Sequence, residues 1–356
     1  MTISIKEAIE KLVNKSNLNL IESQEIMRKI MAGKATNSQI AAILIGLRMK
    51  GETIEELKAF ASIMKENCCQ IHPKVNGRLV DTCGTGGDKI KTFNISTASA
   101  FVVAGAGIAI AKHGNRSVTS KSGSADVLEY LGINLKMPIE KVKKTIEKNG
   151  IGFMFAPIFH PAMKYAITPR KEIGIRTTFN LLGPLTNPAS ADAQVIGVYD
   201  PNLTEKIANV LKNLSCKEAM VVHGLDGIDE ISTLGKTIIS WLKNGQVKTI
   251  EVSPTDFEIN NSDIEELKTT GPYESAEVIF NILYGNYSLQ NPKTEIVLIN
   301  SAAGIIVGGK ADNFISGIEI AWEAISSGAA YKKLIELIRT SDGDLSKIEE
   351  LQKKYG

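Results

Sequence analysis

The chain has 356 residues, of which 43% are hydrophobic and 22% charged, and its net charge is +2. A chain of this length can bury one large core or form two domains of unequal size. Its nearly balanced charge gives no general reason to expect a nucleic-acid or membrane partner, so an anionic ligand would have to be held by local charge.

The cysteines and the N-terminus predict a cytoplasmic protein. Cys68 and Cys69 are adjacent, and with Cys83 and Cys216 they form neither a CxxC pair nor a zinc-binding spacing. The opening residues, MTISIKEAIEKLVNK, lack the apolar segment of a signal peptide. The longest apolar run, residues 98–111, is interrupted by glycine and is too short to span a bilayer.

Residues 1–72 predict a helical domain. Gly33 and Gly51 stand where two of its helices are expected to end. Residues 40–47 are apolar on nearly every face, so this helix should be buried in its own bundle or against a second copy of the chain. Three capping boxes predict helix starts: Ser4 with Glu7, Thr36 with Gln39, and Thr53 with Glu56.

After Pro73 the pattern changes to strands that alternate with helices. Strands are expected at 78–81, 108–111, 194–199, 219–223 and 295–299, and helices at 95–106, 125–131, 203–214 and 314–326. This alternation predicts an α/β fold with a mostly parallel central sheet covered by helices. Ligands of such sheets bind beyond the carboxyl ends of the strands, so the loops that follow the strands are the candidates for a binding site.

One stretch, residues 153–187, is rich in proline and does not fit the alternation. Its helical part, 170–182, is expected to pack back onto the N-terminal helices and to mark a domain junction. The predicted division is a helical domain of 1–72 with 170–190 packed onto it, and an α/β domain of 73–169 and 191–356.

The first chemistry-bearing loop is DTCGTGGD, residues 81–88, which follows a predicted strand. Its glycines allow backbone N–H groups to approach an anion, and Asn94 is a good N-cap for the next helix, whose free N–H groups favour a phosphate. An ordinary tight turn is the alternative. A near match to a phosphate-binding loop at 304–311 ends in alanine, and a helix end before an Asp312 cap explains it better.

The second loop spans 112–124 and contains Lys112, Arg116 and Lys121 with five hydroxyl side chains. This density of donors predicts anion binding, although a solvated surface loop is the alternative. The third loop spans 223–232 and contains Asp226, Asp229 and Glu230, hard oxygen donors of the kind that hold magnesium together with substrate phosphates.

An acidic turn with Asp229 as a helix cap is the alternative interpretation of the third loop.

Taken together, two anion-binding loops and one magnesium loop describe a site for a ligand with several phosphates. 5-Phosphoribosyl diphosphate (PRPP) fits this description, because it carries a diphosphate to chelate the metal and a separate 5′-phosphate.

The motifs resemble the anthranilate phosphoribosyltransferases of tryptophan biosynthesis, in order and over essentially the whole chain. The segments are DTCGTGGD (81–88), FNISTASA (93–100), KHGNRSVTSKSGSADVLE (112–129), FAPIFHPAMK (155–164), TPRKEIGIRTTFNLLGPLTNP (168–188) and HGLDGIDEIS (223–232). Thr119 stands where many members carry serine, and both residues have a hydroxyl.

This resemblance implies transfer of the 5-phosphoribosyl group of PRPP to the amine of anthranilate, with Lys112, Asn115 and Arg170 as catalytic residues. It also implies two magnesium ions per monomer held by Ser96, Asp229 and Glu230, and a homodimer formed through the helical domains. The implied anthranilate contacts are Gly84, His113, Asn115, Arg170 and Pro184. The implied PRPP contacts are Gly84, Gly87, Asp88, Thr92, Asn94, Ile95, Ser96, Thr97, Lys112, His113, Gly114, Asn115, Arg116, Ser117, Val118, Thr119, Ser120 and Ser124.

The residue chemistry agrees with these roles. Arg170 has the forked geometry that suits the carboxylate of anthranilate, and it follows Pro169 where a helix is expected to start. An arylamine is neutral at pH 7, so its attack on the ribose needs no strong base. A covalent role for Cys83 is the less favoured alternative.

Two other functions are consistent with the fold class. A nucleoside phosphorylase of the pyrimidine type would use inorganic phosphate and would not need the acidic pair at 229–230. A nucleic-acid-binding relative of the fold should be distinctly basic and should have damaged motifs, whereas this chain has intact motifs and a net charge of +2.

Overall fold

A computed structural model describes residues 3–86, 90–117, 122–259 and 261–356. The N-terminal part is a bundle of α1 (Ile5–Val13), α2 (Leu20–Met31), α3 (Asn37–Lys50) and α4 (Ile54–Glu66). The three predicted capping boxes are confirmed at the starts of α1, α3 and α4. A fourth box, in which Asn19 and Glu22 cap α2, was missed by the sequence analysis.

The α/β part is built on a seven-stranded sheet with the strand order β3-β2-β1-β4-β5-β6-β7. Strands β3 to β5 in this order are parallel, while β6 and β7 add an antiparallel hairpin at one edge. The prediction of a mostly parallel sheet covered by helices is therefore confirmed. The strands are β1 (Leu79–Gly84), β2 (Ala109–Gly114), β3 (Ile151–Phe155), β4 (Ala193–Gly197), β5 (Glu218–Gly224), β6 (Thr237–Lys243) and β7 (Gln246–Val252).

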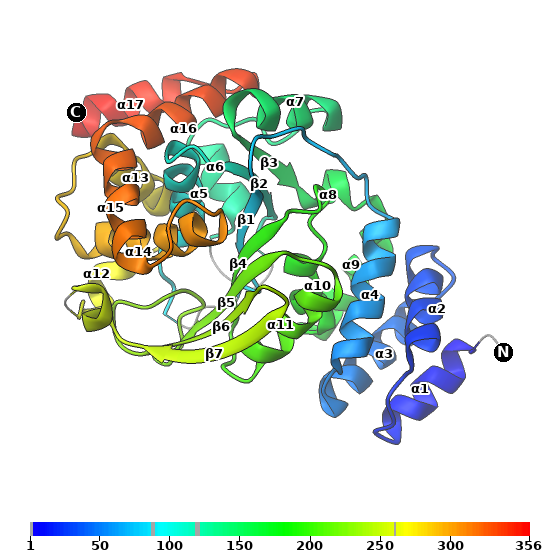
Figure 1. Ribbon diagram of the computed structural model, residues 1–356. Coiled ribbons are helices and arrows are strands. Elements are labelled where there is room, and N and C mark those ends of the chain that lie inside the picture. Colours follow the sequence, from blue (N-terminus) through cyan, green and yellow to red (C-terminus); the bar gives the residue numbers. More distant parts are fainter. Residues whose placement is uncertain (1–2, 87–89, 118–121, 260) are drawn as a thin grey trace.

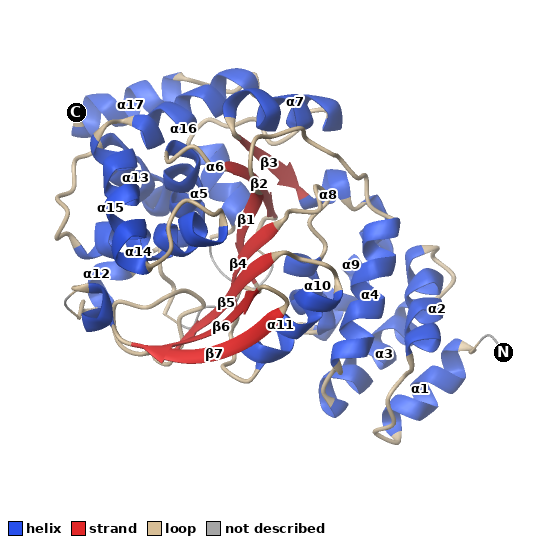
Figure 2. Cartoon of the chain, in the orientation of Figure 1, coloured by secondary structure: helices blue, strands red, loops and turns tan. Residues whose placement is uncertain are grey.

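Helices cover both faces of the sheet (Figures 1 and 2). The remaining helices are α5 (Ile95–Gly105), α6 (Ser124–Tyr130), α7 (Ile139–Asn149), α8 (Ala156–Phe159), α9 (Lys164–Ile173), α10 (Thr178–Leu185), α11 (Leu203–Asn213), α12 (Ile264–Leu267), α13 (Pro272–Tyr284), α14 (Pro292–Val307), α15 (Phe314–Ser326), α16 (Ala329–Thr340) and α17 (Ser346–Tyr355), with short 3₁₀ turns at Pro161–Met163 and Pro254–Phe257.

Alternate residues of the central strands belong to two hydrophobic cores. Val195 and Met220 pack with α5 and α14, whereas Ile196 and Val221 pack with α11, α10 and the N-terminal bundle. This alternation follows from the two-residue period of a strand. One face of the sheet therefore shares a continuous core with the helical bundle.

Two of the predicted secondary-structure elements were wrong. The strand expected at 295–299 lies inside α14, which begins at Pro292 with Asn291 as its N-cap. Residues of α14 from Ile296 to Val307 are buried on every side, and such a helix has no polar face to distinguish it from a buried strand. The helix expected at 170–182 is two helices, α9 and α10, because Gly174 ends α9 in a left-handed conformation.

Strand β3 and the hairpin β6–β7 were also missed. Asn244 and Gly245 join the hairpin with positive φ angles of 51° and 73°, the conformation that an Asn-Gly turn favours. Helix α9 contacts α3, and α10 contacts α4, so the segment after β3 lies against the N-terminal bundle. Within the part of the chain that is described, no helix combines the length and the apolar character needed to cross a bilayer.

Candidate functional site

A pocket of about 440 Å³ lies at the carboxyl ends of β1 and β2, between the α/β part and α9–α10. The chain leaves β1 toward β2 on one side and returns to β4 on the other, so the pocket is at the point where the strand order reverses. All three predicted loops reach this pocket. The predicted site residues that line it are Gly84, Thr92, Asn94, Ile95, Ser96, Lys112, His113, Gly114, Asn115, Arg116, Ser117, Ser124, Arg170, Pro184, Asp229 and Glu230.

The remaining predicted residues do not contribute to the described pocket wall. Thr97 is fully buried behind the wall at the start of α5, and its hydroxyl has no hydrogen-bond partner among the described residues. Gly87, Asp88, Val118, Thr119 and Ser120 lie outside the described residues.

Lys112 lies on β2 and is only 4% exposed. Its ammonium group donates to the backbone oxygens of Thr82 and Ser96 and to the Ser96 hydroxyl, the last at 3.4 Å. Burial lowers the pKa of Lys112, while the nearby Asp81, Cys83 and Glu230 oppose this shift. The result is a desolvated cation at the floor of the pocket, where an anion interacts with it strongly.

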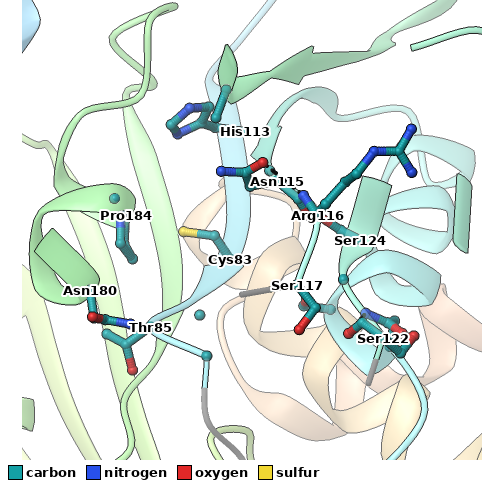
Figure 3. A pocket seen from close by; sticks show the side chains of 18 of the residues that line it. Cys83, Thr85, His113, Asn115, Arg116, Ser117, Ser122, Ser124, Asn180 and Pro184 are labelled. Carbon is teal, nitrogen blue, oxygen red and sulfur yellow. Dashed lines mark hydrogen bonds between the residues drawn. The ribbon is translucent and has the colours of Figure 1, made fainter. Parts of the chain in front are cut away.

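Cys83 lies in the same wall, and Figure 3 shows its side chain among those that line the pocket. Burial raises the pKa of the thiol well above its ordinary value, and Asp81 adds to this shift. The thiol therefore stays protonated near pH 7. A protonated thiol is a poor nucleophile, which argues against the covalent alternative.

Arg116 does not point its guanidinium into the pocket, as Figure 3 shows. Nη1 lies 2.8 Å from Asp126 and 2.9 Å from Glu129, two carboxylates of α6. These partners raise the pKa of Arg116. The ion pairs of Arg116 therefore attach the second loop to α6. Lys112, in contrast, is a buried cation of this loop beside the pocket.

Asn94 occupies the N-cap position of α5, but its side chain makes no capping hydrogen bond. The amide oxygen instead accepts hydrogen bonds from the hydroxyls of Ser122, at 2.7 Å, and Ser275, at 2.9 Å. The expectation of a conventional cap was therefore wrong. A hydroxyl from the second loop and one from α13 compete successfully with the helix N–H groups for this oxygen.

The third loop brings two carboxylates to the pocket beside Ser96. The carboxylate of Glu230 accepts a hydrogen bond from the backbone N–H of Ser96 at 3.1 Å. Asp226 does not line the pocket, because its carboxylate is bonded to the Ser232 hydroxyl at 2.5 Å and to the backbone N–H of Ile228 at 3.1 Å. Residues 229–232 are described and lie outside any helix, so the helix-cap alternative is wrong.

Hard oxygen donors of this kind fit magnesium, which is typically held by one or two protein carboxylates and completed by substrate phosphates. Asp229 and Glu230 supply the carboxylates, and Ser96 offers a hydroxyl. Among the described residues, no three His, Cys, Asp or Glu side chains converge into a metal site formed by the protein alone.

Arg170 lies on the opposite wall, in the last turn of α9. The expectation that Pro169 opens a helix was wrong, because α9 already begins at Lys164 and includes the proline. The guanidinium carbon of Arg170 lies 5.4 Å from the centre of the Phe179 ring, and burial lowers its pKa. No described carboxylate pairs with it, so the pocket contains a desolvated cation suited to an anionic ligand.

Two histidines meet beside this wall. The ring centres of His113 and His160 are 4.9 Å apart, and the Nε2 atom of each has no hydrogen-bond partner among the described residues. Burial lowers the pKa of His113 to about 3 and that of His160 to about 4. Both rings are therefore neutral at pH 7 and offer flat, weakly polar surfaces.

Part of the pocket wall was not predicted from the sequence. His160, Phe179 and Asn180 come from the segment between β3 and β4, and Thr269 and Gly271 come from the segment just before α13. None of these residues follows a predicted strand or belongs to a glycine-rich loop. The segment FAPIFHPAMK is one of the family motifs, and it is the signal that could have identified His160.

Comparison with known proteins agrees with this architecture. The glycosyl transferase family α/β domain matches residues 76–331, and the helical bundle domain of the same family matches residues 6–68. The anthranilate phosphoribosyltransferase of Methanocorpusculum labreanum is 52% identical over 339 residues, which cover 95% of this chain and 98% of the relative.

Solved structures show the same similarity. The anthranilate phosphoribosyltransferase of Thermus thermophilus is 37% identical with a TM-score of 0.87, covering 94% of this chain and 99% of that chain. The Saccharomyces cerevisiae enzyme, in complex with PRPP and Mg, is 28% identical with a TM-score of 0.87, covering 95% and 98%.

The helical bundle, the parallel sheet and the anion-binding pocket at the strand reversal define a glycosyl transferase with a separate helical domain. Sequence identity of about 50% to anthranilate phosphoribosyltransferases, over nearly the full length, identifies the family within this class. The chain belongs to the family of anthranilate phosphoribosyltransferases.

Proposed function

We propose that this chain transfers the 5-phosphoribosyl group of PRPP to the amine of anthranilate and releases diphosphate. The observation that carries the proposal is a pocket in which glycine-rich and hydroxyl-rich loops face Arg170, a partly buried arginine that forms no ion pair with a described carboxylate. The yeast relative has been solved in complex with PRPP and Mg, and also with 4-fluoroanthranilate. The pocket offers matching chemistry for both kinds of ligand.

PRPP is proposed to bind on the α/β side of the pocket. Figure 3 shows Ser117 and Ser122 on the wall opposite Asn180 and Pro184, so phosphate-binding donors and the α10 wall face one another. The backbone of the first loop, the Asn94–Thr97 turn and the second loop supply N–H and hydroxyl donors. Gly87, Asp88 and residues 118–120 remain predicted contacts on the strength of the family resemblance.

Magnesium is proposed to be held by Ser96, Asp229 and Glu230, with two ions per monomer. When bound with PRPP, it would neutralise charge on the departing diphosphate. Lys112 is proposed to act on the same charge, because its ammonium is buried beside Ser96 and Glu230. Electrostatic stabilisation of this kind is strong in a desolvated pocket.

Anthranilate is proposed to bind between Arg170, Asn115 and the His113 ring, close to Gly84 and Pro184. Arg170 would hold its carboxylate, and the neutral imidazole would leave the amine unprotonated. The amine nitrogen then attacks C1 of the ribose, the bond from C1 to the diphosphate oxygen breaks, and the nitrogen loses a proton. Orientation of the two substrates in one enclosed site supplies much of the acceleration.

Assembly, location and domain limits are part of the same proposal. Val13, Ile21 and Met49 of the helical domain are 71%, 70% and 76% exposed, and these apolar side chains support a homodimer through that domain. A cytoplasmic location and the division at residues 1–72, 170–190 and the remainder follow the same family resemblance. Sedimentation of Ile21→Lys alongside the wild type tests the dimer, and an unchanged mass for the variant would contradict this interface.

The test of the reaction is the fluorescence of anthranilate over time, with purified protein, PRPP and magnesium. A loss of fluorescence that requires both PRPP and magnesium is expected. Folded protein that leaves the signal unchanged, in an assay where a known enzyme works, would contradict the proposal. Phosphorolysis of uridine and thymidine would then test the phosphorylase alternative.

A further inference from the structure

We infer that Ser275, a residue outside the three loops, positions the Asn94 amide so that its NH₂ group is presented to a phosphate of PRPP. This inference rests on the proposed function. Ser275 is a positioning residue, because it is fully buried in the first turn of α13 and does not line the pocket.

The segment before α13 is attached to the chain that leads into α5. Thr92 forms a β-bridge with Lys268, and the backbone N–H of Thr269 donates to the oxygen of Lys91 at 3.2 Å. Thr269 itself lines the pocket. This attachment brings Ser275 beside Asn94, although the two residues are 181 positions apart in the sequence.

Ser275 and Asn94 make two reciprocal hydrogen bonds. The Ser275 hydroxyl accepts from the Asn94 backbone N–H at 2.9 Å and donates to the Asn94 amide oxygen, also at 2.9 Å. The Ser122 hydroxyl donates to the same oxygen at 2.7 Å. A hydroxyl has one proton, so these contacts use both the donor and an acceptor position of Ser275.

This pattern determines which way the amide faces. With the amide oxygen turned toward both hydroxyls, each hydroxyl proton has an acceptor. A flipped amide would place NH₂ against Ser122 and Ser275 and would leave the Ser275 proton without one. The NH₂ group is therefore the free end of the side chain, and its described partner is a long contact of 3.5 Å to the backbone oxygen of Ser122.

An amide NH₂ held in this way is a donor for an anion. Asn94 lines the pocket on the side of Ser122 and Gly123, away from Arg170 on the opposite wall. Neutral donors with fixed direction add selectivity for phosphoryl oxygens to the attraction of Lys112. We therefore expect Ser275 to affect PRPP rather than anthranilate.

The test is a double-mutant cycle with Ser275→Ala, Asn94→Ala and the double variant. Ser275→Ala should raise the KM for PRPP about ten-fold, the cost of weakening one hydrogen bond to a charged group, with the KM for anthranilate within about two-fold. In the Asn94→Ala background the same substitution should change neither constant, because Ser275 acts through Asn94.

Ser301→Ala is the matched control, since Ser301 is a fully buried hydroxyl of α14 whose oxygen has no described partner. It should leave both constants unchanged. Ser275→Cys, which keeps the volume with a weaker donor, replaces Ser275→Ala if that variant does not fold. Equal rises in both KM values, or an additive cycle, would overturn the inference.

Failure of the proposed function can be told apart from failure of this inference. A wild-type chain that transfers the phosphoribosyl group, with a Ser275→Ala variant that is unchanged, overturns this inference alone. If the wild type shows no transfer, the affinities of the wild type and of Ser275→Ala for PRPP are compared instead, by calorimetry in the presence of magnesium. Equal affinities, or no binding to the wild type, would then overturn the inference.

Discussion

Arg170 is a single residue whose surroundings are unfavourable for stability but suit the binding role proposed for it. Its guanidinium is desolvated, stacks near Phe179 and has no described carboxylate partner. Partial burial of a cation without a carboxylate partner is unfavourable in the free protein. Such a residue is retained where a ligand supplies the missing charge.

Substitution of Arg170 should therefore separate binding from stability. Arg170→Ala should raise the KM for anthranilate about ten-fold to a hundred-fold, because a charged hydrogen-bonded contact is lost, and should change the KM for PRPP far less. Arg170→Met should preserve or slightly raise the free energy of unfolding measured in urea. Equal effects on the two KM values would contradict the assignment.

Asp229 and Glu230 are the residues through which magnesium should act. Asp229→Asn combined with Glu230→Gln should move the magnesium concentration that gives half-maximal activity upward by at least about ten-fold, because two charged ligands become neutral. Asp226→Asn is the control from the same loop, since its carboxylate is engaged by Ser232 and Ile228. A magnesium titration that is the same in the double variant and the wild type would remove the metal role.

At the scale of elements, the ends of β1 and β4 set the position of the third loop. Gly84 and Gly197 are opposite one another in the parallel ladder, and the Asp229 backbone packs directly over Gly197. A Cβ atom at Gly197 would lie 1.6 Å from the Asp229 backbone oxygen. The loop can approach the strands this closely because both positions lack a side chain.

Gly197→Ala should consequently displace Asp229 and lower kcat/KM for PRPP by at least about a hundred-fold, since small displacements at a reacting site have large effects. Gly235→Ala is the control, because a Cβ added there would have a carboxylate oxygen of Asp226, 3.9 Å away, as its nearest neighbour. The two variants should be compared by steady-state kinetics and by thermal unfolding. A fully active Gly197→Ala variant would show that the loop is not held by this contact.

At the scale of the whole molecule, the pocket is lined by residues of the α/β part, of α9 and α10, and by Met64 of the N-terminal bundle. Figure 1 shows α9 and α10 between the sheet and that bundle. The His113–His160 contact crosses this junction, from β2 to the turn that precedes α9. Both imidazoles are held neutral by burial, with pKa values of about 3 and about 4. Acid should therefore loosen the molecule at the same junction that forms the site.

The sign of this effect follows from linkage. Because the folded-state pKa of His160 lies below the unfolded value of 6.5, the unfolded chain takes up a proton first as the pH falls, and stability is lost from pH 6.5 toward pH 4. Each such histidine should remove about 2 kcal/mol of stability between pH 7 and pH 5.

Urea unfolding at pH 7 and pH 5 measures this loss. His160→Gln should reduce the difference between the two pH values by about 2 kcal/mol relative to the wild type. His72→Gln, at an exposed histidine, is the control and should leave the difference unchanged. The same loss in His160→Gln and wild type would contradict a neutral, buried His160.

The local features of this chain were determined by its sequence alone. Capping boxes such as that of Thr53 with Glu56 involve residues three positions apart, so their chemistry is visible without the fold. The segments DTCGTGGD and KHGNR, each at the end of a predicted strand, likewise predict anion-binding loops. The distinctive motifs indicated the family. The residue types of the third loop identified its three carboxylates, and the family resemblance selected Asp229 and Glu230 among them as the predicted metal ligands.

Tertiary structure decided which of those groups face the pocket. Two carboxylates of α6 hold the Arg116 side chain away from the pocket. Thr97 is buried in the first turn of α5, and the Asp226 carboxylate is hydrogen-bonded within its own loop. The run at 295–299 lies inside α14, whose burial on every side leaves no periodicity in the sequence to distinguish a helix from a strand. Ser275 met Asn94 through pairing between segments far apart in sequence, and such long-range contacts depend on the complete packing of the chain, which no local pattern records.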